Sequence, residues 1–356
     1  MSIIQNPNKV ISIPDFNSIT QSIKTINRAV PAIENGVYSY FTDSIKLAST
    51  IANNLTNQMT DALTSLPTTL ENLKLVEGFA SNIEKINNAV KTGEIDEKMA
   101  DIGRNQLQAK LNDAASLIIL KFDQYGDELS ESAQRLAKYS DRIEVRLIDA
   151  SATETANQAR AKADFDRESA RLKTLETSLS ELNKAVDEKR GGPAEDLLAL
   201  IPDEKALSSL IDVGAADAAA PEVAAAKKTI ELAVSEIKKV LEVVDKTIEF
   251  VQLANIRDEI FKATQAQREV LNAVVKRLKD TKNTIAELDY INTTGEAMAT
   301  AATEVNKMVL TFSKFVNDIQ NLDGKQITAA LISGLYDSMN SYLDLVRKSQ
   351  NNVILT

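Results

Sequence analysis

Apolar side chains recur at helical spacing along two long segments of the chain. In the first segment the steps alternate between three and four residues, which is the spacing of a coiled-coil seam: Leu172, Leu175, Leu179, Leu182 and Val186. The second segment continues the same pattern at Ile230, Val234, Ile237, Leu241 and Val244. Neither glycine nor proline interrupts residues 127–190 or 222–294. The pattern predicts two helical arms, each on the order of 100 Å long at 1.5 Å per residue.

Residues 191–226, between the arms, are rich in helix breakers and in large apolar side chains. They hold three of the seven prolines and three of the eleven glycines. Eight large apolar residues lie on two short helical faces: Leu197, Leu198, Leu200, Ile201, Leu207, Leu210, Ile211 and Val213. We expect an antiparallel hairpin that turns near residue 207, with Ala159 and Ala163 opposite residues 250–256.

The remaining segments, residues 1–126 and 295–356, are expected to form a helical body on the base of the hairpin. Asp15 is a candidate cap for a helix that reaches about Pro31, and Pro67 is expected to end the next one. Gly126 and Gly295 are taken as the points where body and arms meet. The predicted fold is all-α: an elongated bundle of about five main helices with a very long hairpin that ends in a short apolar tip.

Composition excludes several kinds of chemistry. The chain has no Cys and no His, which removes metal sites built on those ligands, imidazole acid–base catalysis and Cys nucleophiles. Its net charge of −10 argues against a nucleic-acid partner. No glycine-rich phosphate loop or Ser nucleophile motif occurs, and pairs such as Glu195-Asp196 suit helix caps. We therefore expect no enzymatic activity, no cofactor and no metal.

The tip allows two interpretations. Its apolar residues could pack on one another or on the arms as a small cap, or they could be masked at first and then released into a membrane. Seven acidic residues against one lysine make the tip too charged to span a bilayer alone. It could still span as one strip of a ring whose acids face a water-filled lumen. The lack of Trp and Tyr near the tip counts against insertion.

Residues 1–18 contain no basic region followed by an apolar run, so we expect no signal peptide. No window of 18 apolar residues occurs, so we expect no ready-made transmembrane helix and a protein that is soluble as made.

This organisation resembles the cytolysin-A-like α-pore-forming toxins, and within them the B component of the xenorhabdolysin-type binary cytotoxins of Gram-negative bacteria. The features that carry the resemblance are the length, the lack of Cys, the two long arms and the tip sequence PAEDLLALIPDEKALSSLIDV. The resemblance implies a monomer, exported without a classical signal peptide, that assembles with an A-type subunit on a target-cell membrane and forms a lytic ring. On that account residues 197–213 enter the bilayer. Candidate hinges are Gly191, Gly192, Pro193, Gly214 and Pro221.

Two other functions remain open. The chain could be a non-lytic structural or adaptor protein that binds partners through its heptad faces. It could also be a toxin component that acts alone or in a three-part system. An alternative membrane element is the uncharged apolar stretch at residues 327–336.

Overall fold

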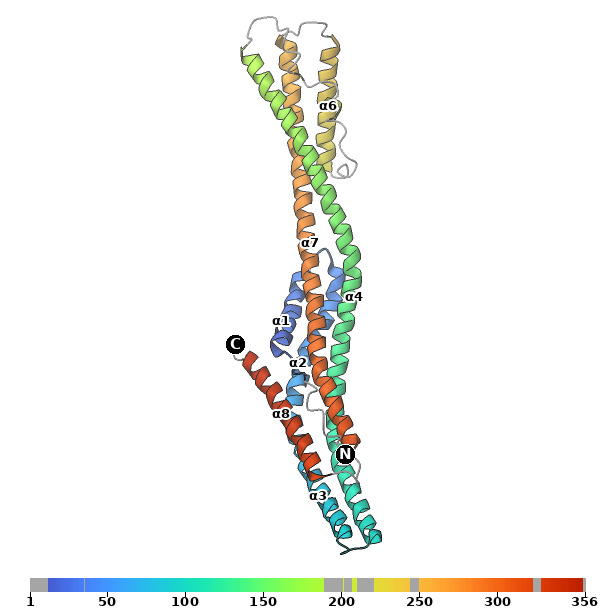
Figure 1. Ribbon diagram of the computed structural model, residues 1–356. Helices are drawn as coiled ribbons and strands as arrows, with labels where there is room; N and C mark the ends of the chain where they lie inside the picture. Colours follow the sequence, from blue (N-terminus) through green and yellow to red (C-terminus); the bar gives the residue numbers. More distant parts are fainter. Residues whose placement is uncertain are drawn as a thin grey trace. The chain divides into compact units, whose positions relative to one another are not determined.

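A computed structural model describes residues 12–34, 36–188, 201, 207–209, 221–243, 250–322 and 328–354 (Figure 1). Every regular element in these ranges is a helix, so the all-α prediction is confirmed. The elements are α1 (Phe16–Ile33), the short 3-10 helix η1 (Ser39–Phe41), α2 (Thr42–Leu70), α3 (Asn72–Lys91), α4 (Glu97–Glu188), α6 (Pro221–Val243), α7 (Phe250–Gln320) and α8 (Ala329–Ile354). They form two compact units, which we call unit 1 (residues 1–148 and 287–356) and unit 2 (residues 149–286).

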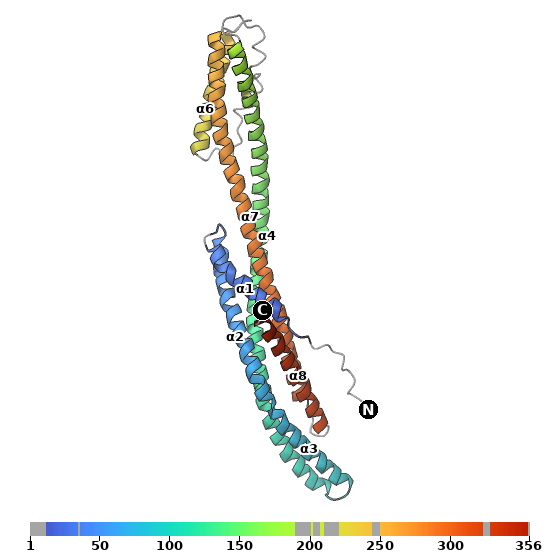
Figure 2. The ribbon, with the colours of Figure 1, turned by 90° about the vertical axis from the view of Figure 1, so that its left-hand side faces the viewer.

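Unit 1 is a bundle in which the shorter helices pack beside the first part of α4 and the last part of α7. Helix α1 packs on α2, and α8 packs on α1, α2 and α3 (Figure 2). Aromatic rings join α4 to α7: the ring of Phe122 lies 5.4 Å from that of Phe312 and 4.7 Å from that of Phe315. Rings of this size bury much apolar surface, so they form a large share of the core of this unit.

The start of α1 follows the sequence prediction. The Asp15 carboxylate accepts hydrogen bonds from the backbone N–H groups of Asn17 at 3.0 Å and Ser18 at 3.2 Å. These two bonds satisfy N–H groups that have no partner inside the helix. The same carboxylate accepts a third bond from the Ser18 hydroxyl, and these hydrogen bonds lower the pKa of Asp15.

The prediction that Pro67 ends a helix is wrong, because α2 continues through it to Leu70. Proline has no N–H, so the carbonyl of Leu63, four residues earlier, loses its partner within the helix. The guanidinium of Arg347 on α8 donates to that carbonyl at 2.7 Å. A side chain 284 positions away in the sequence therefore supplies the hydrogen bond that the proline removes.

Helices α4 and α7 continue through Gly126 and Gly295, so neither glycine ends a helix. The two compact units divide between residues 148 and 149 and between residues 286 and 287, and the predicted division into body and arms stays a prediction. At Gly295 the absence of a side chain allows α4 to pack closely against α7 within unit 1. The Ser140 hydroxyl donates to the Gly295 carbonyl at 2.8 Å, and a Cβ at this position would lie 3.3 Å from Ile143. The glycine thus allows α4 and α7 to approach closely.

The second arm is not one helix over residues 222–294, which corrects the sequence prediction. It is divided between α6 and α7, and residues 244–249 lie outside the described residues. Ile237 on α6 and Ile256 on α7 line one groove, although an uninterrupted helix would separate them by about 28 Å. The chain therefore reverses its direction between Val243 and Phe250, and α6 and α7 are antiparallel neighbours (Figure 1).

The reversal also changes the predicted register of the arms. Ala159 on α4 does not face residues 250–256. It lines a groove with Leu278 and Lys282 of α7. Most residues around the expected turn near residue 207 lie outside the described residues, and along the chain α6 follows them before α7 begins.

The contact between Arg347 and Pro67 can be tested with a double-mutant cycle. Arg347→Met should lower the free energy of unfolding by about 1–2 kcal/mol, because the buried Leu63 carbonyl then lacks a donor. In a Pro67→Ala background the same change should cost less, since the alanine N–H can bond to that carbonyl. Urea unfolding followed by circular dichroism measures both values. Lys348→Met, at the exposed neighbouring position, is the control, and equal costs of Arg347→Met in both backgrounds would contradict the interpretation.

Candidate membrane-insertion site

Unit 2 consists of the last part of α4, the whole of α6 and the first part of α7. Helix α6 buries one face, on which the buried residues recur at helical spacing and are each at most 2% exposed: Val223, Ala226, Ile230, Ala233, Val234 and Ile237. They share one apolar core with Leu175 and Leu182 of α4 and with Ile256 and Ile260 of α7. The apolar face of α6 is thus covered by the other two helices of its unit.

Two of the eight residues predicted to enter a membrane are described, and both are buried in this core. Ile201 is 7% exposed and Leu207 is fully buried. Beside Leu207, the hydroxyl of Ser208 lies 3.2 Å from the ammonium of Lys238, which is far along α6 from its first residue. This part of the predicted tip therefore lies alongside α6, with its large apolar side chains covered.

Of the other residues predicted to insert or to act as hinges, all but one lie outside the described residues. They are Leu197, Leu198, Leu200, Leu210, Ile211, Val213, Gly191, Gly192, Pro193 and Gly214. The exception is Pro221, which is the first residue of α6. Proline suits this position, because the N–H that it lacks would have no partner inside the helix.

A buried polar layer links α4 to α7 beside the apolar core. The Glu168 carboxylate is fully buried and accepts hydrogen bonds from Arg167 at 2.8 Å, Arg171 at 3.1 Å and Gln267 at 2.9 Å. The amide of Gln267 also donates to the Glu168 carbonyl at 3.2 Å. Burying a carboxylate is costly unless several donors surround it, so this arrangement selects one alignment of the two helices.

Two further ion pairs fix the antiparallel register of α4 and α7. Asp164 pairs with Arg277, and Glu176 pairs with Arg268 at 2.7 Å. The residue number falls along α7 as it rises along α4, as required for antiparallel helices. These polar contacts join α4 to α7, and the buried face of α6 is apolar.

The outer surface of the α6–α7 pair carries charged groups beside exposed apolar ones. Lys239 pairs with Glu236 at 2.6 Å and Lys262 with Glu259 at 2.5 Å, and in each case the hydrogen bond with the carboxylate raises the pKa of the lysine. These pairs are mostly solvent-exposed, so they contribute little to stability.

Leu232 on α6 and Phe261 on α7 are half exposed on the same helix pair. Leu232 is not predictable as a core or site residue from the sequence pattern, because it lies outside the apolar stripe formed by Ile230, Val234 and Ile237. The sequence does indicate that Leu232 is exposed, because it follows the buried Ile230 by two residues and therefore lies on a different face of the helix.

Among the described residues, no helix has the length and apolar character needed to cross a bilayer by itself. The same residues contain no cluster of three acidic or other potential metal ligands.

The fold is shared with solved structures of pore-complex subunits, although no protein-family model and no curated protein matches the chain. A chain of the XaxAB pore complex from Xenorhabdus nematophila is 17% identical, with a TM-score of 0.64 over 96% of this chain and 99% of that one. PaxB from Photorhabdus luminescens is 16% identical, with a TM-score of 0.61 over 96% and 97%. A chain of the YaxAB pore complex is 18% identical, with a TM-score of 0.60 over 95% and 99%. At these identities the likeness establishes the fold.

Glu168 and Glu176 provide a matched test of the α4–α7 pairing. Glu168→Ala should lower the free energy of unfolding by about 3 kcal/mol, because it leaves the buried Gln267 amide and two partly buried arginines without their acceptor. Glu176→Ala removes a pair that is about half exposed and should cost less than about 1 kcal/mol. Urea unfolding gives both values, and hydrogen exchange in α4 and α7 locates the effect. Equal costs would show that the buried layer does not fix the pairing.

Proposed function

We propose that the chain is a subunit of a two-component pore-forming cytolysin. It would assemble with an A-type partner subunit on a target membrane and insert its helical tip there. The observation that carries the proposal is the burial of Ile201 and Leu207, two large apolar residues of the predicted tip, against the apolar face of α6. The fold shared with chains of the XaxAB and YaxAB pore complexes supports it.

The contacts within unit 2 favour release of the tip and α6 over separation of α4 from α7. Apolar contacts have no directional requirement, so lipid can replace the surface that α4 and α7 offer to α6. The Glu168 layer is different, because its donors and carboxylate would find no equivalent partners in a hydrocarbon environment. On this proposal α4 and α7 stay paired while residues 191–226, with the rest of α6, leave the core.

Assembly into a ring explains how charged segments could cross the membrane. Helix α6 carries four acidic and four basic side chains, which is too many for a single span surrounded by lipid. In a ring of subunits, one face of each segment contacts lipid and the charged face lines water or a neighbouring subunit. The partner subunit would complete this ring, and the activity would be mechanical rather than enzymatic.

The proposed path runs from a secreted water-soluble monomer, exported without a classical signal peptide, to the target-cell membrane. Residues Gly191, Gly192, Pro193, Gly214 and Pro221 are the proposed hinges. The fold resemblance to pore-complex subunits weighs against the non-lytic adaptor. A toxin that acts alone or in a three-part system would differ from the proposed two-component cytolysin only in the partner subunits that it requires.

The tip can be tested by placing charges on its apolar faces. Leu198→Asp combined with Ile211→Asp should reduce lysis of red cells to background when the chain is mixed with its A-type partner. Each carboxylate adds on the order of 3 kcal/mol to the cost of insertion. Circular dichroism should show an unchanged helical content before membrane contact.

The control places the same charges on exposed apolar positions of unit 1, Leu75 and Leu345. Leu75→Asp with Leu345→Asp should retain lysis. Full lysis by the tip variant would overturn the insertion proposal. Dye release from liposomes by the chain alone would favour a toxin without partners, and no release with any partner would favour the adaptor.

A further inference from the structure

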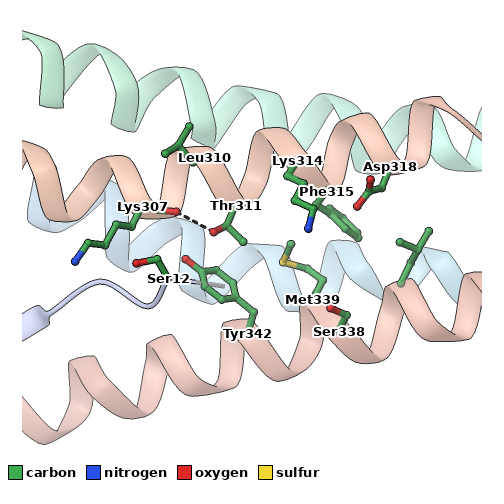
Figure 3. A pocket seen from close by; sticks show the side chains of 11 residues that line it. Ser12, Lys307, Leu310, Thr311, Lys314, Phe315, Asp318, Ser338, Met339 and Tyr342 are labelled. Atoms are coloured by element: carbon green, nitrogen blue, oxygen red, sulfur yellow. Dashed lines mark hydrogen bonds between the residues drawn. The ribbon is translucent and has the colours of Figure 1, made fainter. Parts of the chain in front are cut away.

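A groove runs between α7 and α8 in unit 1, and none of its lining residues belongs to the segments proposed to enter the membrane. Its volume is about 390 Å³, within the usual range of small-molecule sites. Its apolar lining comes from both helices: Leu310 and Phe315 on α7, and Leu335 and Met339 on α8. Phe315 and Met339 are nearly buried, whereas Leu310 is 70% exposed at the rim. The groove thus offers an apolar floor that is open on one side (Figure 3).

The hydroxyl of Tyr342 faces this groove beside the hydroxyl of Thr311. The side chain is 1% exposed, and its Oη atom makes no hydrogen bond of good geometry to the described residues. The Thr311 hydroxyl donates to the Lys307 carbonyl at 2.8 Å (Figure 3), and its interaction with the Tyr342 oxygen only partly offsets the effect of burial on the pKa of Tyr342. Burial raises the pKa of Tyr342 to about 12, so the hydroxyl is protonated at neutral pH and can donate. A buried donor without an acceptor is costly, and a ligand acceptor would remove that cost.

The charged groups give the groove two different ends. Lys307 lies toward the Tyr342 hydroxyl, and Asp318 lies at the opposite end (Figure 3). Lys307 pairs with Glu304 at 2.6 Å, whereas no ion pair joins Lys314 to an acidic residue in the described parts of the chain. A negatively charged group would therefore be attracted toward the end with Lys307 and Tyr342 and repelled by Asp318, and Lys314 lies between the two ends (Figure 3).

We propose that this groove binds a single-chain amphiphile with an anionic head group, specifically a long-chain fatty acid. The carboxylate accepts the Tyr342 hydrogen bond at the Lys307 end of the groove, and the Lys314 ammonium adds a longer-range attraction from farther along it. The hydrocarbon chain covers Phe315, Leu335 and Met339. This assignment satisfies the buried hydroxyl, matches the charges and covers the apolar floor with one molecule.

Isothermal titration of the full-length chain with sodium laurate, below its micelle concentration, tests the proposal. We expect saturable binding of one laurate per chain. Dodecanol, which lacks the charge, and butyrate, which lacks the long chain, should each bind at least about tenfold more weakly. Because no membrane or partner subunit is present, failure of this test leaves the pore-forming proposal untouched.

Three variants separate the site from nonspecific binding. Tyr342→Phe keeps the ring and should weaken binding about tenfold, the effect of losing a hydrogen bond to a charged group. Met339→Trp should abolish binding by filling the floor, and Lys314→Gln should weaken it several-fold. Lys85→Gln, on α3, should leave it unchanged.

Circular dichroism establishes that each variant is folded. An absence of saturable laurate binding to the unmodified chain overturns the proposal. Equal affinity in the unmodified chain and in folded Tyr342→Phe and Met339→Trp variants overturns it as well.

Discussion

Coverage of the apolar face of α6 is the interaction on which the arrangement of unit 2 depends. Alone in water, a helix that presents Val223, Ile230, Val234 and Ile237 on one face would expose a continuous apolar stripe. Helices α4 and α7 cover that stripe, and Ile201 and Leu207 join the same core. The proposed function requires this coverage to be exchanged for lipid, so one set of contacts both stabilises the water-soluble form and defines what would be released.

Polar and apolar contacts have different roles within unit 2. The Glu168 layer and the pairs Asp164–Arg277 and Glu176–Arg268 depend on the alignment of α4 and α7, because each needs a particular donor opposite a particular carboxylate. Apolar packing of α6 tolerates exchange of partners. A charged buried layer also contributes less net stability than apolar packing of the same volume, so its value lies in specifying register.

Membrane insertion of the tip stays a prediction, whereas the expected course of the second arm as one helix was wrong. The large apolar residues of the tip were recognisable from spacing, and the two that are described are buried. The division of the second arm into α6 and α7 was missed because neither glycine nor proline occurs between Val243 and Phe250. Conversely, interruptions of helices were predicted at Pro67 and Gly295. At Pro67 the helix continues, and Arg347 donates to the carbonyl that the proline leaves without a partner. At Gly295 the helix also continues, and Ser140 donates to the glycine carbonyl where α4 and α7 approach closely.

The sequence by itself determined that the chain is helical, which faces of its helices are apolar, and where Asp15 begins α1. These properties are local, since they depend on residues within one or two turns of each other. The tertiary structure decided whether residues 222–294 form one helix or two antiparallel ones, and which residues of α4 face α7. The spacing of apolar residues is the same in one straight helix and in two antiparallel helices, because the helical period does not depend on where the chain reverses. That choice depends on contacts between distant residues, such as Ile237 with Ile256 and Glu168 with Gln267.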